Sequence, residues 1–297
     1  MRNYRLEAKQ AVKIGIDSYC FHRYFGEVYP EQQAPDFQMN MDDFLDLAKE
    51  LEVDGVSLES CFFPSYEPAF LKDLKAKLDD YGFDRVYAWG HPDGLERGQN
   101  PAAYEDMAAS IDRALLIGAD TMRVVASSLM FRHEPHQPQI EALVKQFRRV
   151  MPQAEAAGMK IAVENHIDFT SDEMVQMIEA VASPNFGINF DTGNFLRLLD
   201  DPLKGMDKLA KYTFATHIKD LKLNRSAAPD DWFFFSSTPV GDGLVDNQAL
   251  AQKLKDSGYN GFLAVETDFL HPDYAGEEHA VVRKSVANLK RIAASLT

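Results

Sequence analysis

The chain is poor in cysteine, in long apolar runs and in positive charge. Two cysteines, Cys20 and Cys61, stand among 297 residues. They are too few for a disulfide framework or a thiolate metal site, and we interpret both as reduced thiols. No stretch approaches the roughly 18 apolar residues of a membrane helix, and the first residues lack an apolar signal region, so we expect a cytoplasmic protein that does not contact the membrane. The 31 basic residues against 46 acidic ones leave a formal charge of −15, which argues against a nucleic-acid partner.

Linkers that would divide the chain are also missing. No low-complexity tract and no run rich in proline, glycine and serine interrupts the sequence. A hydrophobic content of 45% is ample for one large core, so we expect residues 1–297 to form a single domain. No Gly-x-Gly-x-x-Gly motif follows the first apolar segment, which counts against a dinucleotide-binding fold.

Strand-like and helix-like segments alternate along the chain, which is the pattern of α/β folds. We expect an amphipathic helix from Met41 onward and a closing helix at Glu277–Ser295. The segments expected to be strands are Lys13–Tyr19, Val53–Glu59, Phe83–Trp89, Thr121–Ala126, Ile161–His166, Gly187–Asn194, Phe214–Asp220 and Phe262–Asp268. Eight strands that alternate with helices favour a closed barrel, so the sequence predicts a single (β/α)₈ TIM barrel. The alternative is an open α/β sheet that acts as a non-catalytic sugar-binding module.

The last four predicted strands all end in residues that can bind a metal ion. These residues are Glu164, Asp191, His217 and Glu266. Carboxyl ends of parallel strands meet at one end of a barrel, where active sites are built. Carboxylates gathered there would repel one another, and a divalent cation between them removes that cost. Three carboxylates and one imidazole suit Mn²⁺, Mg²⁺ or a similar ion, so the sequence predicts one divalent metal ion.

Polar residues beside these positions are candidates for catalysis and substrate binding. His166 follows Glu164 closely and could polarise a bound sugar or only support the metal ligands. Strand alternation places Lys219 on the same side as His217. There it could contact substrate oxygens or form a salt bridge among the loops. Asn194 begins the next helix and could cap it or touch the substrate.

The four segments that end in metal-binding residues resemble the sugar phosphate isomerase/epimerase group of the xylose-isomerase-like TIM barrel superfamily. The resemblance runs from about Lys13 to the C-terminus, is strongest after Ile161, and includes Pro239–Gly243 and Gly258–Gly261. It implies that the four residues above bind one divalent ion, with Mn²⁺ favoured and Mg²⁺, Co²⁺ or Zn²⁺ as alternatives. It also implies a small-molecule carbohydrate substrate and a homodimer or homotetramer.

The resemblance further implies chemistry at a carbon next to a carbonyl. Glu164 and Glu266 would exchange protons with the substrate, and the metal would stabilise the resulting enediolate. We therefore expect an isomerase or epimerase acting on a sugar or a polyol-derived keto compound. A lyase or dehydratase acting on a keto sugar or an inosose starts from the same enediolate and is the main alternative.

Several positions depart from the family pattern. Asn194 stands where a histidine is common. Thr170 and Leu223 replace a glutamate and an arginine of the ketose 3-epimerases, although Arg225 lies near. These differences weaken an assignment as a classical ketose 3-epimerase. The distantly related endonuclease IV type of nuclease needs three zinc ions and many more ligands, so it is disfavoured.

Loops at the predicted active end supply candidates for substrate binding. The candidates are His22, Trp89, His91, Asn194, Arg225 and Trp232. The aromatic run Trp232–Phe235 lies in a long predicted loop. There it would form a wall over the pocket or pack on another subunit, because consecutive aromatic residues are unusual in a solvated segment.

Overall fold

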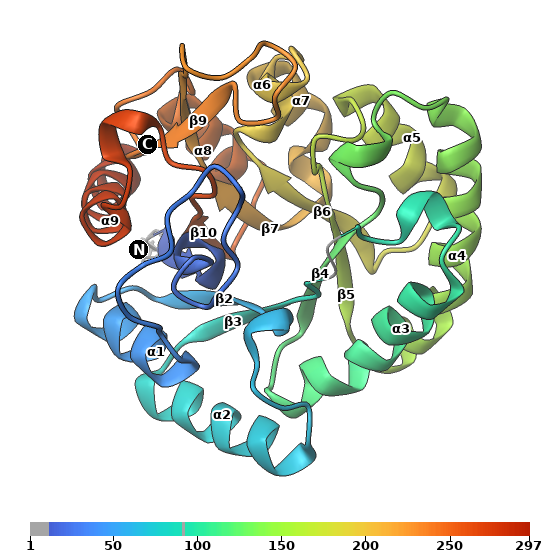
Figure 1. Cartoon of the computed structure of the whole chain (residues 1–297). Helices are drawn as coiled ribbons and strands as arrows, with labels where there is room; N and C mark the ends of the chain where they lie inside the picture. The colour runs from blue at the N-terminus through green and yellow to red at the C-terminus, as the bar shows by residue number, and fades with distance from the viewer. Residues whose placement is uncertain (1–11, 91–92) are drawn as a thin grey trace, which may run out of the picture.

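Eight parallel strands form a closed barrel at the centre of the molecule (Figure 1). The computed structural model describes residues 12–90 and 93–297. The strands are β1 (Lys13–Asp17), β2 (Gly55–Glu59), β3 (Asp84–Ala88), β4 (Thr121–Val125), β5 (Lys160–Glu164), β6 (Phe186–Asp191), β7 (Thr213–Ile218) and β10 (Phe262–Val265). They follow one another around the barrel in the order β1-β10-β7-β6-β5-β4-β3-β2, and β1 pairs with β10 to close it. The predicted (β/α)₈ TIM barrel is therefore confirmed.

Helices surround the barrel on its outside (Figure 1). They are α1 (Met41–Glu50), α2 (Pro68–Tyr81), α3 (Pro101–Leu116), α4 (His136–Ala156), α5 (Ser171–Val181), α6 (Asn194–Arg197), α7 (Pro202–Leu209), α8 (Asn247–Asp256) and α9 (Glu278–Ser295). Local sequence determines where α1 and α5 begin. Asn40 and Asp43 form a capping box at the start of α1, and Thr170 and Glu173 form one at the start of α5. Thr170, which replaces a family glutamate, thus serves as a helix cap.

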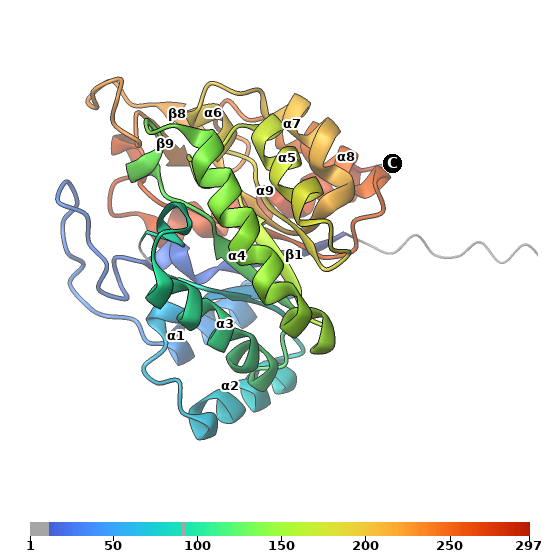
Figure 2. The same cartoon turned by 90° about the vertical axis from the view of Figure 1, so that its right-hand side faces the viewer.

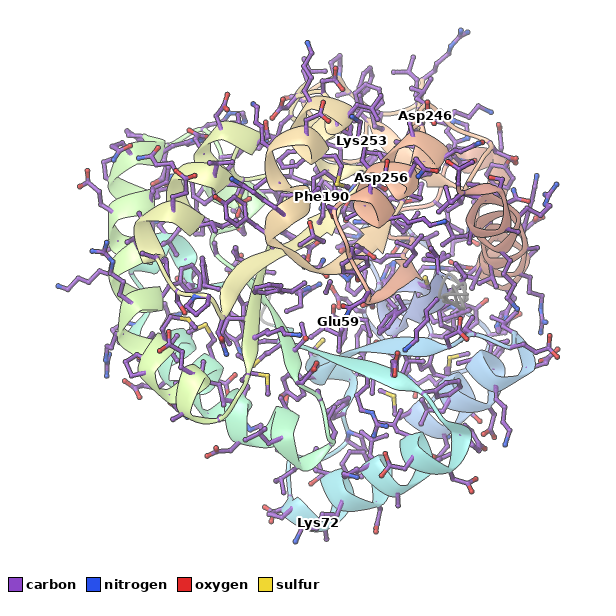
Figure 3. The ribbon with its side chains drawn as sticks, turned by 180° about the vertical axis from the view of Figure 1, so that it is seen from behind. Glu59, Lys72, Phe190, Asp246, Lys253 and Asp256 are labelled. Carbon is purple, nitrogen blue, oxygen red and sulfur yellow. The ribbon has the colours of Figure 1, made fainter. Side chains whose placement is uncertain are left out.

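The interior contains two apolar layers. The larger one joins residues of the strands to residues of the helices, and the smaller one is made of residues at the first or third position of β3, β5, β7 and β10. The smaller layer consists of Val86, Ala162, Ala215, Phe262 and Ala264, with Phe214 packed against it. Polar side chains therefore occupy the other end of the barrel interior. Seen from behind, Glu59 lies near the barrel centre, whereas Lys72 lies at the outer surface of α2 (Figure 3).

The sequence prediction is wrong for the segment after the seventh strand. Instead of a long loop, a two-stranded antiparallel sheet follows β7, formed by β8 (Asp220–Leu223) and β9 (Phe235–Thr238). Strands of four residues are too short to show a clear period of two. Their pairing depends on where the rest of the barrel places them.

The carboxyl ends of the barrel strands face one side of the molecule, which we call the barrel mouth. Figure 2 shows the loop after β1, in blue, and the loop between β8 and β9, in orange, projecting from this side. Within the part of the chain that the structure describes, no helix is both long and apolar enough to cross a membrane.

Candidate metal centre

The four predicted metal ligands converge at the barrel mouth. Glu164 ends β5, Asp191 ends β6, His217 lies near the end of β7, and Glu266 follows β10. Each offers one ligand atom within 4.8 Å of the others, and all four are buried. Two atoms on opposite sides of one ion lie about 4–5 Å apart when each bond is about 2.0–2.6 Å. The group therefore has the spacing needed to hold a divalent metal ion.

The imidazole of His217 is oriented by carboxylates on both of its edges. Its Nδ1 lies 2.8 Å from Glu266 Oε2 and 3.2 Å from Glu164 Oε1. Its Nε2 lies 3.2 Å from Oδ2 of Asp17, a fully buried residue at the end of β1. A carboxylate behind a metal-binding histidine accepts the ring proton and leaves the other nitrogen free to bind the ion. Nδ1 is therefore the ring nitrogen that faces the group.

The unpaired polar atoms of the centre fit a metal ion. Glu164 Oε2, Asp191 Oδ2 and Glu266 Oε2 are buried and accept no hydrogen bond from the described residues. Arg123 and Lys219 form ion pairs with these oxygens. None of these contacts counts as a hydrogen bond, so each oxygen keeps lone pairs with which it can bind an ion. Three such oxygens and one imidazole nitrogen form a donor set for a hard or intermediate divalent cation.

Arg123 is a buried partner of the centre that sequence reasoning did not identify. It lies on β4, with Nε 2.7 Å from Glu164 Oε2 and Nη2 2.7 Å from Glu59 Oε1. Burial disfavours the charged form of Glu164, but Arg123 and His217 outweigh it and hold the pKa of Glu164 well below its usual value. Burial raises the pKa of Glu59 to about 8, although Arg123 opposes this. The sequence feature that could have identified Arg123 is the position of this arginine inside the apolar run Thr121–Ala126.

Lys219, like Arg123, is a buried cationic side chain beside the four proposed ligands. Its Nζ lies 2.9 Å from Asp191 Oδ2, 3.2 Å from Glu266 Oε2 and 2.9 Å from Asp268 Oδ2. Burial disfavours the charged form of Glu266, but His217 and Lys219 outweigh it and lower its pKa to about 2. Lys219 and His217 lie on the same side of the chain, as strand alternation predicts.

Asp268 ties Lys219 to the β8–β9 sheet. Its Oδ1 accepts hydrogen bonds from Arg197 Nη2 at 2.8 Å and from Ser237 Oγ, on β9, at 2.7 Å. The guanidinium of Arg197 lies 5.1 Å from the centre of the Trp232 ring. Sequence reasoning missed Asp268, although its position two residues after Glu266 was a usable signal.

Asn194 and His166 lie next to Glu164. Asn194 Nδ2 lies 3.4 Å from Glu164 Oε1 and donates to the carbonyl of Asn165 at 3.0 Å. Asp191 Oδ1 accepts from the backbone N–H groups of Gly193 at 2.8 Å and Asn194 at 2.9 Å, which fixes that carboxylate. His166 Nδ1 has no hydrogen-bond partner among the described residues, and burial lowers the pKa of this imidazole.

Two other residues predicted to bind substrate, His22 and Trp89, do not lie among the four proposed ligands. Both ring nitrogens of His22 face backbone carbonyls, those of Glu27 and Asp268. Trp89 lies in the layer between strands and helices, where Nε1 donates to Asp106 of α3 at 2.9 Å. His91 lies outside the described residues.

The aromatic run is not a solvated loop. Trp232 packs edge-to-face on Tyr29 at 5.3 Å, and Phe233 stacks on Phe269 at 4.3 Å between ring centres. The run thus packs against the loop after β1 and the segment after β10. Arg225 is exposed between β8 and β9.

The sequence and the fold both have counterparts among known proteins. A family model described as Xylose isomerase-like TIM barrel matches residues 45–292. The chain is 25% identical over 195 residues to 3-oxo-isoapionate decarboxylase of Pectobacterium atrosepticum, which covers 65% of this chain and 64% of that protein. It is 24% identical over 152 residues to inosose dehydratase of Lacticaseibacillus casei, which covers 47% of this chain and 51% of that protein. Each match thus spans less than two thirds of the relative's own length.

A similar barrel is found among solved structures. The crystal structure of IOLI protein with a bound zinc atom has a TM-score of 0.73 and 15% identity, and the match covers 96% of this chain and 99% of that chain. At this identity the likeness concerns the fold alone.

Proposed function

Because the chain belongs to the xylose isomerase-like TIM barrel family, we propose that it is a divalent-metal-dependent isomerase or epimerase acting on a sugar or a polyol-derived keto compound. The observation that carries the proposal is the buried group of Glu164, Asp191, His217 and Glu266, with donor atoms within 4.8 Å of one another. We propose Mn²⁺ as the ion, with Mg²⁺, Co²⁺ or Zn²⁺ as alternatives. The zinc atom bound to a protein of the same fold supports a divalent ion in general.

Two carboxylates are proposed to carry the protons. When bound, the ion would polarise the carbonyl and the adjacent hydroxyl of the substrate. Glu164 or Glu266 would remove a proton from the carbon, and the other would return one on the opposite face. Arg123 beside Glu164 and Lys219 beside Glu266 favour the ionised carboxylates, which is the form that a base requires.

Lys219 and His166 are the further proposed catalytic groups. The ammonium of Lys219 borders two of the proposed ligands and can donate to a substrate oxygen as negative charge develops there. His166 has an unpaired Nδ1 near Glu164 and can exchange a proton or a hydrogen bond with the substrate.

Substrate binding is proposed for the side chains at the mouth. Asn194 is best supported because it already touches Glu164. Trp232 offers an aromatic face beside Arg197. The substrate-binding roles of His22, Trp89, His91 and Arg225 stay predictions.

A lyase or dehydratase acting on a keto sugar or an inosose is the second candidate. It is favoured by two of the relatives, a decarboxylase and a dehydratase. The same first step would serve it, and Lys219 could then protonate a departing hydroxyl. The two candidates differ in what leaves the substrate after the proton has been removed.

Proton exchange in D₂O tests the proposal. We expect the metal-loaded protein, incubated with a panel of ketoses, inososes and 3-keto sugars, to place deuterium at one carbon of a product observed by NMR. An isomerase or epimerase gives a product of unchanged composition, whereas a lyase also releases water or carbon dioxide. Glu164→Gln and Glu266→Gln should each lower the exchange rate by about 10²–10⁴-fold, the usual contribution of a general base.

Glu141→Gln is the matched control, because Glu141 is exposed on α4. It should exchange at the wild-type rate. Wild-type exchange in both site variants would contradict the two-carboxylate mechanism and move the proton transfer to His166 or Lys219.

A further inference from the structure

The ammonium of Lys219 lies against two of the proposed metal ligands. Its Nζ is 2.9 Å from Asp191 Oδ2 and 3.2 Å from Glu266 Oε2, and none of these three side chains is more than 4% exposed. Neither oxygen accepts a hydrogen bond from the described residues. A metal ion held by the centre would therefore meet the same two oxygens as the ammonium, and two cations repel each other strongly in a buried site.

The hydrogen bond of this ammonium goes to a third carboxylate. Lys219 Nζ donates to Asp268 Oδ2 at 2.9 Å, and Asp268 is not one of the four proposed ligands. The contacts with Asp191 and Glu266 are ion pairs without hydrogen-bond geometry. An ion can therefore take those two oxygens while the hydrogen bond to Asp268 stays in place.

Asp268 is held in position without the help of Lys219. Arg197 grips it with both ends of the guanidinium, at 2.8 Å from Nη2 to Oδ1 and 2.5 Å from Nη1 to Oδ2. Ser237 Oγ donates to Oδ1 at 2.7 Å, and the backbone N–H of Phe269 donates to the same oxygen at 2.6 Å. Asp268 thus offers the ammonium a fixed partner beside the centre.

The backbone of Lys219 is equally well fixed. The hydroxyl of Thr192 accepts from the Lys219 N–H at 2.9 Å and donates to the Lys219 carbonyl at 2.9 Å. Asn247 Nδ2 donates to the same carbonyl at 2.9 Å. A Cβ at Gly193 would stand 3.0 Å from Lys219 Cβ, so the stem of the lysine lies close to this glycine. Only the flexible end of the side chain is left to move between the ligands and Asp268.

We propose that Lys219 and Asp268 together set the affinity of the centre for its ion. In the metal-free protein the ammonium balances Asp191 and Glu266, which as buried like charges would otherwise repel each other. When an ion binds, the same ammonium opposes it. Asp268 is a positioning residue that holds the ammonium at the side of the centre and so limits this competition. The inference rests on the metal ion of the proposed function.

The Mn²⁺ affinity of uncharged variants tests the proposal. We expect Lys219→Met to bind Mn²⁺ about 10-fold or more tightly than wild type at pH 8, because a cation beside two ligand oxygens is removed. Asp268→Asn should bind Mn²⁺ about 10-fold or more weakly, because the ammonium loses its other partner and stays on the ligands. Calorimetric titration in buffers of different ionisation enthalpy gives affinities corrected for the protons released.

A double variant separates the positioning role of Asp268 from its charge. In the Lys219→Met background, Asp268→Asn should change the affinity by about 3-fold or less, because the ammonium that it positions is gone. An equally large loss of affinity in both backgrounds would overturn the positioning role.

The melting temperature of the metal-free protein is a second readout. Lys219→Met should melt below wild type in the presence of a chelator, and added Mn²⁺ should raise its melting temperature by more than that of wild type. Lys219→Gln is also uncharged and keeps the test valid if Lys219→Met fails to fold. Lys222→Met is the matched control, because Lys222 is 45% exposed on β8 and pairs with Asp273. It should bind Mn²⁺ and melt as wild type does.

Weaker or unchanged Mn²⁺ binding by the uncharged Lys219 variants would mean that the ammonium does not compete with the ion, and would overturn the proposal. Deuterium exchange separates this result from a failure of the proposed function. Affinities that change as expected in a protein that exchanges no carbohydrate proton contradict the proposed function and leave the inference standing. Exchange by wild type, with unchanged affinity in the Lys219 variants, overturns the inference alone.

Discussion

At the scale of single residues, His217 holds the centre together because it is the one nitrogen donor among three carboxylates. Asp17 on one edge of the ring and Glu266 on the other orient it. Removal of the imidazole would leave Glu164, Asp191 and Glu266 with one fewer positive neighbour and without the proposed nitrogen ligand.

His217→Ala should lose the metal ion. We expect the metal content of protein purified without chelator to fall from about one divalent ion per chain to near zero, because a ligand is removed and the remaining carboxylates repel one another. Elemental analysis measures this directly. His136→Ala is the control, since His136 lies on α4 and contacts Glu173. An unchanged metal content in His217→Ala would place the ion elsewhere.

Metal affinity should rise with pH. Burial raises the pKa of Asp191 to about 7, and Lys219 opposes this. Burial alone would lower the pKa of His217, but Glu266 and Glu164 outweigh it and raise the pKa well above the usual value. Both groups thus hold protons in the metal-free protein below pH 7, and only their deprotonated forms bind a metal.

The expected change is about tenfold in affinity per pH unit for each proton displaced. Below about pH 7 both groups contribute, and between pH 7 and pH 8 only His217 does. Calorimetric titration with Mn²⁺ in buffers of different ionisation enthalpy measures the affinity and the protons released together. An affinity that does not change over this range, with no proton release, would mean that neither group gives up a proton to the ion.

At the scale of elements, Asp220 organises the chain between β9 and α8. Its Oδ2 accepts from the N–H groups of Gly241 at 2.8 Å and Gly243 at 3.0 Å, and its Oδ1 accepts from Val245 at 3.0 Å. A Cβ at Gly243 would stand 2.2 Å from Asp220 Oδ1, so only glycine allows this approach. The Pro239–Gly243 motif therefore has a local structural purpose.

Asp220→Ala should destabilise the fold. We expect a loss of about 1–3 kcal/mol, because several backbone N–H groups lose their acceptor together. The melting temperature should fall by about 2–4 °C per kcal/mol in a domain of this size. Asp80→Ala, at an exposed position of α2, should melt with the wild type. Equal melting of the two variants would show that water replaces the lost acceptor at no cost.

At the scale of the whole molecule, one aromatic ring helps to close the barrel. Phe262, at the start of β10, fills the space next to β1 and β2. A Cβ at Gly15 or at Gly55 would stand 2.3 Å or 2.5 Å from its ring. The two strands can thus approach this ring only because both positions lack a side chain.

Gly55→Ala should destabilise the barrel by about 1–3 kcal/mol through overpacking. Combination with Phe262→Leu should recover part of this loss, because the smaller side chain makes room for the new methyl group. Thermal unfolding of the two single variants and the double variant measures the coupling. Additive effects would mean that the methyl group does not meet the ring.

The homodimer or homotetramer and the cytoplasmic location stay predictions.

The eight barrel strands and the residues at the barrel mouth can be predicted from local sequence patterns. An apolar run that ends in a metal-binding residue can be recognised without knowing which other segments it packs against. Glu164, Asp191, His217 and Glu266 were identifiable in this way. Their convergence then follows from the rule that the carboxyl ends of parallel strands meet at one end of a closed barrel.

The amino-acid sequence by itself thus determined the eight strands of the barrel and the four residues of the centre. Only the tertiary structure decided which charges surround them. Arg123 pairs with Glu164, Asp17 with His217, and Asp268 with Lys219 because neighbouring strands and loops place them within about 3 Å. Such pairs join distant parts of the chain and depend on strand register, which no local pattern encodes. The short β8–β9 sheet was decided in the same way, since two four-residue strands are stable only when packed on a formed barrel.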